Sequence, residues 1–401
     1  MSLGLYISVP FCRTKCTYCN FASDVFSRGV FDRYVGCVSE DISRALQIAE
    51  QIAAHLDPEA DSIYLGGGTP TILDPTQLQR VFAAVSQNFE VTSNAEITVE
   101  CAPGTLTPPV LDGLLACGVN RVSLGVQSFI DAEAASIGRL HKRSVVLEDI
   151  ARLRAAGISN INIDLIAGLP HQTPQSWQAS LAQTLNTGVP HVSVYMLEVD
   201  EDSRLGRELM AGGTRYHAHF VPDEDATADF YLAACEQLQA AGIAQYEISN
   251  FARAGSESRH NLKYWTRRPY LGFGVDAHSM LLSTSPSVEA VRFSTPDALE
   301  QYIAGFPLQK TTVSQAAALE ETFFLGLRLN RGVDLREISK AFGDPALQNL
   351  CPAIAELIAD ELLHQSGNFI RLTPRGRLLS NEVFQAFLET DAVSTPLPAG
   401  V

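Results

Sequence analysis

Short runs of β-branched and aliphatic residues alternate with longer amphipathic stretches through the first half of the chain. Strands and helices that alternate at this spacing form βαβ units, so the pattern predicts a parallel sheet. The expected strands are Leu5–Val9, Ser62–Leu65, Glu96–Glu100, Arg121–Val126, Asn160–Ile166 and His191–Leu197. The expected helices are 30–55, 75–88, 107–116, 144–156, 174–187 and 224–241. Six such units predict an α/β fold, a partial parallel (β/α)6 barrel, with an open doubly wound sheet as the alternative.

Glycine and polar residues follow these strands. Parallel β/α folds place their chemistry in the loops at the carboxyl ends of the strands, so we expect these residues to share one rim. The rim comprises Cys12–Cys19, Gly66–Thr69, Glu100, Gln127–Ser128, Gly168–Pro170 and Glu198.

The pattern changes in the second half of the chain. A short strand is expected at Gln245–Ile248, before a polar loop, and helical periodicity starts near residue 311 and is followed by a hairpin pattern. Helices followed by a small hairpin are similar to a winged-helix domain. We therefore expect a barrel over 1–222, a barrel extension over 223–305, a smaller, mainly helical, winged-helix-like C-terminal domain over 306–390 and a disordered tail over 391–401.

Composition narrows the class of protein. The formal net charge is -16, which argues against a nucleic-acid partner because little would offset the phosphate charge. The sequence contains no stretch of 18 apolar residues, so it predicts no membrane span. The N-terminus lacks the charged region of a signal peptide. We therefore expect a cytoplasmic protein with reduced cysteines. Five of the eight cysteines are scattered, and we interpret these as small core residues.

The other three cysteines form the pattern C-x-x-x-C-x-x-C at Cys12, Cys16 and Cys19. Three thiolates this close can surround a soft metal centre, for which zinc and iron–sulfur are the candidates. Structural zinc normally takes a fourth Cys or His nearby, and none follows within the loop. A four-iron cluster with three protein ligands leaves one iron open to a small molecule. Three unligated core cysteines are the remaining alternative.

This motif, placed after the first strand and before a GGGTP loop, resembles the radical S-adenosylmethionine (SAM) superfamily. The resemblance implies a [4Fe–4S] cluster whose open iron binds SAM, which electron transfer then cleaves. It extends over almost the whole chain, through YISVPFCRTKCTYCNF, LGGGTPT, LGVQSF, DLIAGLP and the C-terminal region. These segments are similar to the oxygen-independent coproporphyrinogen III oxidase family and to its relative, the HemW family of heme chaperones.

The resemblance also implies SAM-binding residues. Tyr6 would contact SAM, and Tyr18 would provide a stacking face. Gly67, Gly68 and Thr69 would approach the methionyl and ribose parts through their backbone. Glu100 would accept hydrogen bonds from the ribose hydroxyls or an ammonium group. Positions that hold a second SAM in the oxidase are matched by Gln127, Arg139 and Asp164. A tight turn at the glycines and ordinary strand-end polar residues elsewhere are the structural alternatives.

Two features separate the two families. The oxidase has a further cysteine where this chain has Phe21, and it carries a long N-terminal extension, whereas this chain begins five residues before Tyr6. RHNLKYW resembles the heme-binding signature of the chaperones, through His260, Tyr264 and Trp265. Histidine is a common heme ligand, and aromatic rings offer flat faces to a porphyrin. A histidine packed in a polar loop is the structural alternative.

The resemblance therefore implies a chaperone that binds heme, a [4Fe–4S] cluster and SAM. Its partners would be heme and an apo-hemoprotein client, such as a membrane respiratory enzyme. We expect a cytoplasmic protein that can associate peripherally with the membrane. A homodimer is a further expectation. The alternatives are coproporphyrinogen III decarboxylation, which the missing features argue against, and another radical SAM reaction on a porphyrin.

Overall fold

The computed structural model describes residues 2–201 and 203–388, and the expected tail 391–401 lies outside these residues. The described residues form a 12-stranded and a 3-stranded sheet. In the larger sheet the strand order is β12-β11-β10-β9-β1-β2-β3-β4-β5-β6-β8-β7. No helix in this part of the chain is long and apolar enough to cross a membrane.

Strands β1 to β6 are parallel neighbours in chain order. They span Leu3–Val9, Glu59–Gly67, Glu90–Cys101, Arg121–Gln127, Asn160–Ala167 and His191–Met196. A doubly wound sheet would reverse its order at a switch point, whereas this order runs in one direction as in a barrel. The predicted partial (β/α)6 barrel is thus confirmed.

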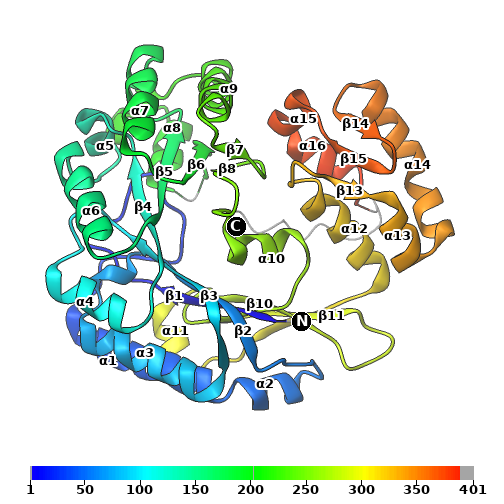
Figure 1. Ribbon diagram of the computed structural model, residues 1–401, viewed down its shortest axis with the longest axis horizontal. Coiled ribbons are helices and arrows are strands. Elements are labelled where there is room, and N and C mark those ends of the chain that lie inside the picture. Colours follow the sequence, from blue (N-terminus) through cyan, green and yellow to red (C-terminus); the bar gives the residue numbers. More distant parts are fainter. Residues whose placement is uncertain (1, 202, 389–401) are drawn as a thin grey trace.

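Helices cover the outer side of this curved sheet (Figure 1). They are α1 (Phe31–Ser43), α2 (Ala45–Gln51), α3 (Pro75–Asn88), α4 (Pro108–Ala116), α5 (Asp131–Ser136), α6 (Arg143–Ala155) and α7 (Pro174–Thr187), with 3-10 turns η1 (Arg28–Val30) and η2 (Pro70–Ile72). The single helix expected over 30–55 is wrong, because Arg44 leaves the helical conformation at φ -97° and ψ 3° and separates α1 from α2.

Alternation along the strands separates two environments. Ile63 and Leu65 on β2 belong to the apolar core. Ser62, before Ile63, and Tyr64, between the two, instead form hydrogen bonds with polar side chains of other elements. Because successive side chains of a strand point to opposite faces, the outer face packs under the helices and the inner face forms a polar interior. This interior carries the candidate site.

The chain then extends the sheet at both edges. One edge gains β7 (Ala244–Gln245) and β8 (Asn250–Ala252), so the single strand expected at Gln245–Ile248 is wrong. The other edge gains β9 (Tyr270–Phe273), parallel to β1, and then β10 (His278–Leu282), β11 (Ala290–Ser294) and β12 (Gln309–Val313). The sheet thus runs past residue 305, where we expected the barrel extension to end. The connecting elements are α8 (Arg204–Met210), η3 (Arg215–Phe220), α9 (Glu224–Ala240), α10 (Arg259–Trp265) and α11 (Leu299–Ile303).

A smaller domain follows β12 and has its own apolar core. Its helices are α12 (Gln315–Gly326), α13 (Leu335–Phe342), α14 (Asp344–Ala359), α15 (Pro374–Leu378) and α16 (Ser380–Gln385), and its sheet contains β13 (Val333–Asp334), β14 (Leu363–Ser366) and β15 (Phe369–Leu372). It lies beside the barrel (Figure 1). Helices with a small hairpin agree with the expected winged-helix-like arrangement.

Candidate functional site

The loop after β1 carries Cys12, Cys16 and Cys19 and is held by backbone hydrogen bonds to distant segments. Cys12 N donates to Asp24 O at 2.9 Å, and Thr17 N donates to Ile137 O at 3.1 Å. The Lys15 ammonium adds a bond to Phe21 O at 2.6 Å. The loop is therefore fixed at the carboxyl end of the barrel, as the sequence predicts.

Burial raises the pKa of the Cys12 and Cys19 thiols above that of a free cysteine. Metal binding requires thiolates, so a bound metal would have to offset this effect. Across residues 2–201 and 203–388, no three His, Cys, Asp or Glu side chains converge on a position suited to one metal ion.

The glycine loop after β2 packs directly on the cysteine loop. Thr69 N donates to Phe11 O, and Gly68 N to Val9 O, each at 2.8 Å. A Cβ on Gly68 would lie 3.0 Å from Cys12 Sγ and 2.7 Å from Phe11 O. Gly67 has a φ of 101°, in the left-handed region that side chains disfavour. Both glycines are thus required for backbone to approach the cysteine loop closely.

Glu100, at the end of β3, is hydrogen-bonded to this glycine loop. Its carboxylate accepts hydrogen bonds from the Tyr64 hydroxyl at 2.9 Å and from Gly67 N at 3.0 Å. Burial raises the pKa of Glu100 to about 7, and the nearby Asp164 carboxylate adds to the effect. Glu100 therefore changes charge near neutral pH.

Tyr18, Gln127 and Arg139 meet on the opposite side of the rim. Arg139 Nη2 donates to the Tyr18 hydroxyl at 3.2 Å. Gln127 adopts a left-handed φ of 67°, and a Cβ on Gly125 would lie 3.3 Å from Gln127 Nε2 and 3.1 Å from Arg139 Nη2. Gln127 Oε1 and Arg139 Nε are buried and have no hydrogen-bond partner among the described residues. Unsatisfied buried polar atoms are costly, so these two mark a place where a polar ligand fits.

Asp164 lies in a hydrogen-bonded network across three strands. It accepts from Ser123 Oγ at 3.0 Å and from Asn162 Nδ2 at 2.6 Å. Burial raises the pKa of Asp164, while these bonds act in the opposite direction. Asp164 is thus anchored by its neighbours beneath the rim, close enough to Glu100 for their charges to interact.

The residues from His260 to Trp265 lie on α10, so the expectation of a loop is wrong. Ser258 caps the helix by accepting from Asn261 N at 3.3 Å. Glu96, from β3, accepts from Arg259 N and His260 N, each at 3.1 Å. A carboxylate at a helix N-terminus is favourable because it meets unpaired backbone N–H groups. These contacts hold α10 inside the barrel, at the amino end of the strands.

The His260 ring is buried and bonded through both nitrogens. Nδ1 is 3.1 Å from Ser62 Oγ, and Nε2 is 2.8 Å from the Tyr264 hydroxyl. Its ring centroid lies 5.3 Å from that of Tyr64 and 6.4 Å from that of Tyr6. Burial lowers the pKa of His260 to about 3, so the imidazole is neutral.

The end of α10 contacts the C-terminal domain. The Arg328 guanidinium lies 4.3 Å from the centre of the Trp265 ring, an arrangement typical of a cation–π interaction. The Trp265 indole N–H is buried and has no hydrogen-bond partner in the described part of the chain. Trp265 therefore keeps one unused donor.

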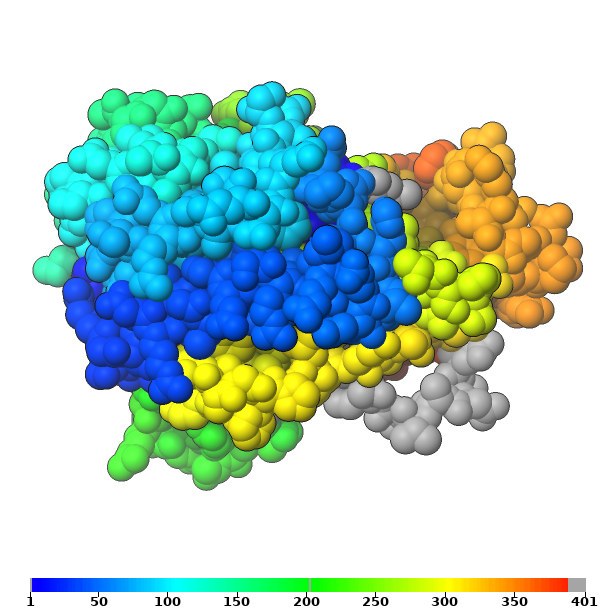
Figure 2. Space-filling view, turned by 90° about the horizontal axis from the view of Figure 1, so that it is seen from below, coloured from blue at the N-terminus to red at the C-terminus, as the bar shows by residue number. Residues whose placement is uncertain are grey.

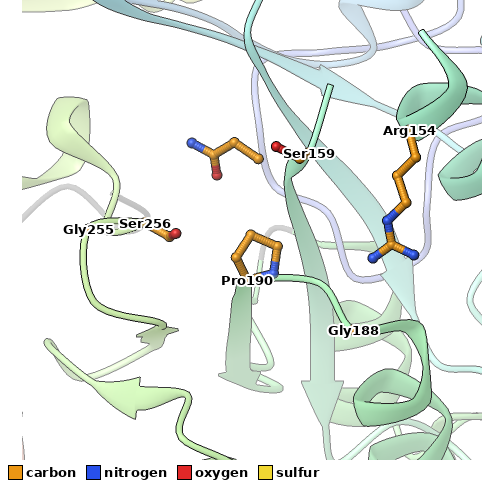
Figure 3. Close-up of a pocket in the computed structure, with 7 residues that line it drawn as sticks. Arg154, Ser159, Gly188, Pro190, Gly255 and Ser256 are labelled. Atoms are coloured by element: carbon orange, nitrogen blue, oxygen red, sulfur yellow. The ribbon is translucent and has the colours of Figure 1, made fainter. Parts of the chain in front are cut away.

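A separate cavity of about 420 Å³ opens at the amino ends of β5 and β6 (Figure 3). Its lining consists of Arg154, Ser159, Asn160, Gly188, Pro190, Gly255 and Ser256. It contains none of the residues that the sequence predicts for the site, and it lies at the end of the barrel away from the cysteine loop.

The structure divides the predicted site residues into two groups. The cysteines, the glycine loop, Glu100 and the Tyr18–Arg139 group lie at the rim, with Asp164 below them, whereas the α10 residues lie deeper. Tyr6 is between the groups, since its ring stacks at 6.1 Å on that of Tyr64. Tyr64 and Ser123, which are inward-facing strand residues, were not among the predicted site residues. Their alternation with buried aliphatic residues was the available signal.

Comparison with known proteins identifies the family of the chain. Residues 6–183 match the model of the radical SAM superfamily, and residues 313–379 match the HemN C-terminal domain. The chain is 36% identical over 387 residues to the heme chaperone HemW of Bacillus subtilis, covering 96% of this chain and 98% of that protein. It is 30% identical to the heme chaperone HemW of Escherichia coli, with the same coverage. Among solved structures, coproporphyrinogen III oxidase (HemN) of Escherichia coli has a TM-score of 0.81 at 24% identity, covering 96% of this chain and 90% of that one.

Proposed function

Since the chain belongs to the HemW family of heme chaperones within the radical SAM superfamily, we propose that it binds heme and delivers it to an apo-hemoprotein. The observation that carries the proposal is the position of α10. This helix bears the heme-signature residues and packs directly below Tyr6 and Tyr64, in the same interior as the cysteine and glycine loops. Heme and the SAM site would therefore influence each other through shared side chains.

The residues at the rim fit a [4Fe–4S] cluster and SAM. Cys12, Cys16 and Cys19 would ligate three irons, and the open iron would take the amino and carboxylate groups of SAM. The glycine loop leaves no room for side chains on its cysteine-facing side, which suits a ligand held by backbone. Gln127 Oε1 and Arg139 Nε provide unused polar atoms at the same rim. When bound, the cluster supplies an electron to SAM.

The chain's own residues would orient SAM. Glu100 would accept from its ribose hydroxyls or ammonium group while Tyr64 and Gly67 hold the carboxylate in place. Tyr6 and Tyr18 would present ring faces. Gln127, Arg139 and Asp164 would bind a second SAM, or position the first. Buried aliphatic residues around Tyr18 would exclude water.

Heme would be held by His260, Tyr264 and Trp265. The neutral imidazole of His260 is the form that ligates iron, but its Nε2 is bonded to Tyr264. Ligation through Nε2 therefore requires that His260 exchange this hydroxyl for iron, while Nδ1 can keep its bond to Ser62. The unused indole N–H of Trp265 and the guanidinium of Arg328 would then meet a heme propionate.

We further propose that the client is a membrane respiratory enzyme, reached by a cytoplasmic protein that associates with the membrane surface. Transfer by a homodimer is part of the same proposal. Decarboxylation of coproporphyrinogen III is the competing function. Phe21, where the oxidase has a further cysteine, argues against it.

Anaerobic reconstitution with iron and sulfide, followed by heme titration and product analysis with coproporphyrinogen III, SAM and a reductant, tests the proposal. We expect retained heme and no protoporphyrinogen. His260→Ala should shift the Soret band and weaken binding, while Trp265→Ala should weaken binding with little spectral change. Catalytic accumulation of protoporphyrinogen, with no heme retained on a column, would establish the oxidase instead.

A further inference from the structure

Three histidines and two aromatic residues gather on the surface next to the rim; they are His171, Tyr216, His217, His219 and Phe220, here called the histidine patch. His171 follows the GLP turn after β5, and the others belong to η3. His171 N donates to Phe220 O at 2.9 Å, which ties the two segments together. Neither the family motifs nor the proposed SAM and heme residues include this patch.

The rings of His171, His217, His219 and Phe220 are in contact. The Phe220 centroid lies 4.0 Å from that of His171 and 4.0 Å from that of His219. His171 Nε2 and His217 Nδ1 are 2.9 Å apart, so one donates to the other. The imidazole that donates keeps the lone pair of its other ring nitrogen, which can still bind a metal. The patch thus combines nitrogen ligands with a flat apolar ring.

The backbone of the patch adopts an uncommon conformation. His171, Tyr216 and His217 have φ values of 67°, 55° and 61°, in the left-handed region. Such a conformation costs free energy for residues other than glycine, and it concentrates at sites that bind ligands. Tyr216 and His217 are consecutive left-handed residues, and both are exposed.

Apolar side chains on the adjoining helix α8 enlarge the surface. Tyr216 is 38% exposed and Phe220 is 46% exposed, and on α8 Leu209 is 40% and Met210 70% exposed. Helix α8 packs against η3, and in Figure 2 the green part of the chain that contains both projects from the edge of the molecule. Contiguous exposed apolar groups indicate a binding surface rather than ordinary exposure.

Arginines concentrate in this segment of an acidic chain. Residues 203–220 carry three arginines, Arg204, Arg207 and Arg215, and one carboxylate, Glu208, while Glu201 and Asp223 lie on either side of the segment. A flat, apolar dianion with a ligand-accepting metal matches the surface in charge and in polarity. A bare divalent cation would use neither the arginines nor the exposed Tyr216 and Phe220.

We propose that the histidine patch is a heme-docking site, at which an imidazole ligates the iron, the aromatic rings contact the macrocycle and arginines pair with the propionates. This inference rests on the proposed heme-binding function and adds a surface site to it. His260 is buried with both nitrogens bonded, whereas the patch is exposed and requires no opening of the barrel. Arriving heme therefore meets the patch first.

The patch also lies close to the cysteine loop. Leu205 N, at the start of α8, donates to Thr17 O at 2.8 Å, inside the cysteine motif. Docked heme would therefore sit beside the rim that the cluster and SAM occupy. A change in the cysteine loop on cluster assembly would be transmitted to α8 through this bond.

The test is a heme titration of the full-length, cluster-loaded protein carrying His171→Asn, His217→Asn and His219→Gln together. Asparagine tolerates left-handed φ, so the first two changes preserve the backbone. His364→Ala, on exposed β14 of the C-terminal domain, is the matched control. We expect the triple variant to bind heme at least about tenfold more weakly, or with slower association and a shifted Soret band, and the control to match wild type.

A second variant, Phe220→Ser, removes the ring but no ligand, and we expect weaker binding without a Soret shift. Zn²⁺ alone is titrated in parallel by calorimetry. Unchanged heme affinity, rate and spectrum in the triple variant would overturn the docking site, and loss of Zn²⁺ binding with heme binding intact would identify a metal-ion site instead. Absence of heme binding by wild type contradicts the proposed function itself and is distinguishable from either result.

Discussion

The two ends of the barrel interior contain the same kinds of side chain but differ in which of their buried polar atoms have hydrogen-bond partners. At the rim, Gln127 Oε1 and Arg139 Nε have no partner within the described residues. Around α10, both nitrogens of His260 are bonded, and Lys263 Nζ lies 2.6 Å from Asp61 Oδ1. The rim therefore offers polar atoms that a ligand could bind, while the chain itself occupies most of the other end. At the α10 end, the Trp265 indole N–H and Arg328 Nε also lack a hydrogen-bond partner within the described residues.

The largest expected effect is at the rim. Cys12→Ala, Cys16→Ala or Cys19→Ala should each abolish the cluster, because these thiolates are its proposed protein ligands. Iron analysis and the visible spectrum after anaerobic reconstitution measure this, with about four irons expected in wild type. Cys37→Ala and Cys351→Ala are matched controls and should keep the cluster. A stable cluster in the Cys16→Ala protein would contradict the assignment.

At the α10 end, the expected loss is in folding stability. Lys263→Met keeps the aliphatic stem, which packs against Gly4, but removes the charge that pairs with Asp61. Asp61 then loses its shortest ion pair but keeps Arg259 at 3.5 Å and Ser2 Oγ at 2.7 Å, so the free energy of unfolding should fall by about 3 kcal/mol, the upper value for a hydrogen bond to a charged group. Urea unfolding followed by circular dichroism measures the loss. A stability equal to that of wild type would show that α10 is not locked by this pair.

The rim and the α10 end also differ in how far the sequence could predict them. The parallel strands and outer helices were predictable because glycine and proline residues separate clear periodic runs. The α10 end was not, because RHNLKYW sits in a polar stretch and depends on Glu96, more than 160 residues earlier, for its capping contacts. Strands β9 to β12 were missed because each is five residues or shorter and forms only by pairing with its neighbours. The histidine patch depends on the meeting of His171 with η3, which no local pattern indicates.

A smaller effect is expected from Glu100→Gln. The amide oxygen can still accept from Gly67 N, and its NH2 group can donate to the Tyr64 oxygen, but the side chain carries no charge, so SAM binding should weaken by roughly 1–3 kcal/mol. Because burial raises the pKa of Glu100 to about 7, wild type should bind SAM more weakly as pH falls below about 7 and the carboxylate takes up a proton. The variant should lose this pH dependence. Equilibrium binding at about pH 6 and about pH 8 measures both effects, and unchanged affinity in the variant would remove Glu100 from the site.

The smallest expected effect concerns the contact between α10 and the C-terminal domain. Trp265→Phe keeps a ring beneath Arg328 but gives a weaker cation–π interaction, so the free energy of unfolding should fall by about 1 kcal/mol. Urea unfolding is again the measurement, and the loss should be clearly smaller than for Lys263→Met. A larger loss would mean that Trp265, rather than the Asp61–Lys263 pair, holds α10 in place.

The parallel pairing of β1 with β9 has a consequence for synthesis on the ribosome. β1 ends at Val9 and β9 begins at Tyr270, so one edge of β1 remains unpaired until the second strand has emerged. At about 5–20 residues per second, this interval lasts roughly 13–52 s. The cysteine loop, directly after β1, emerges at the start of that interval, and α10 emerges just before its end. Until then, the three thiols would be open to iron and sulfide from the α10 end of the interior as well as from the rim.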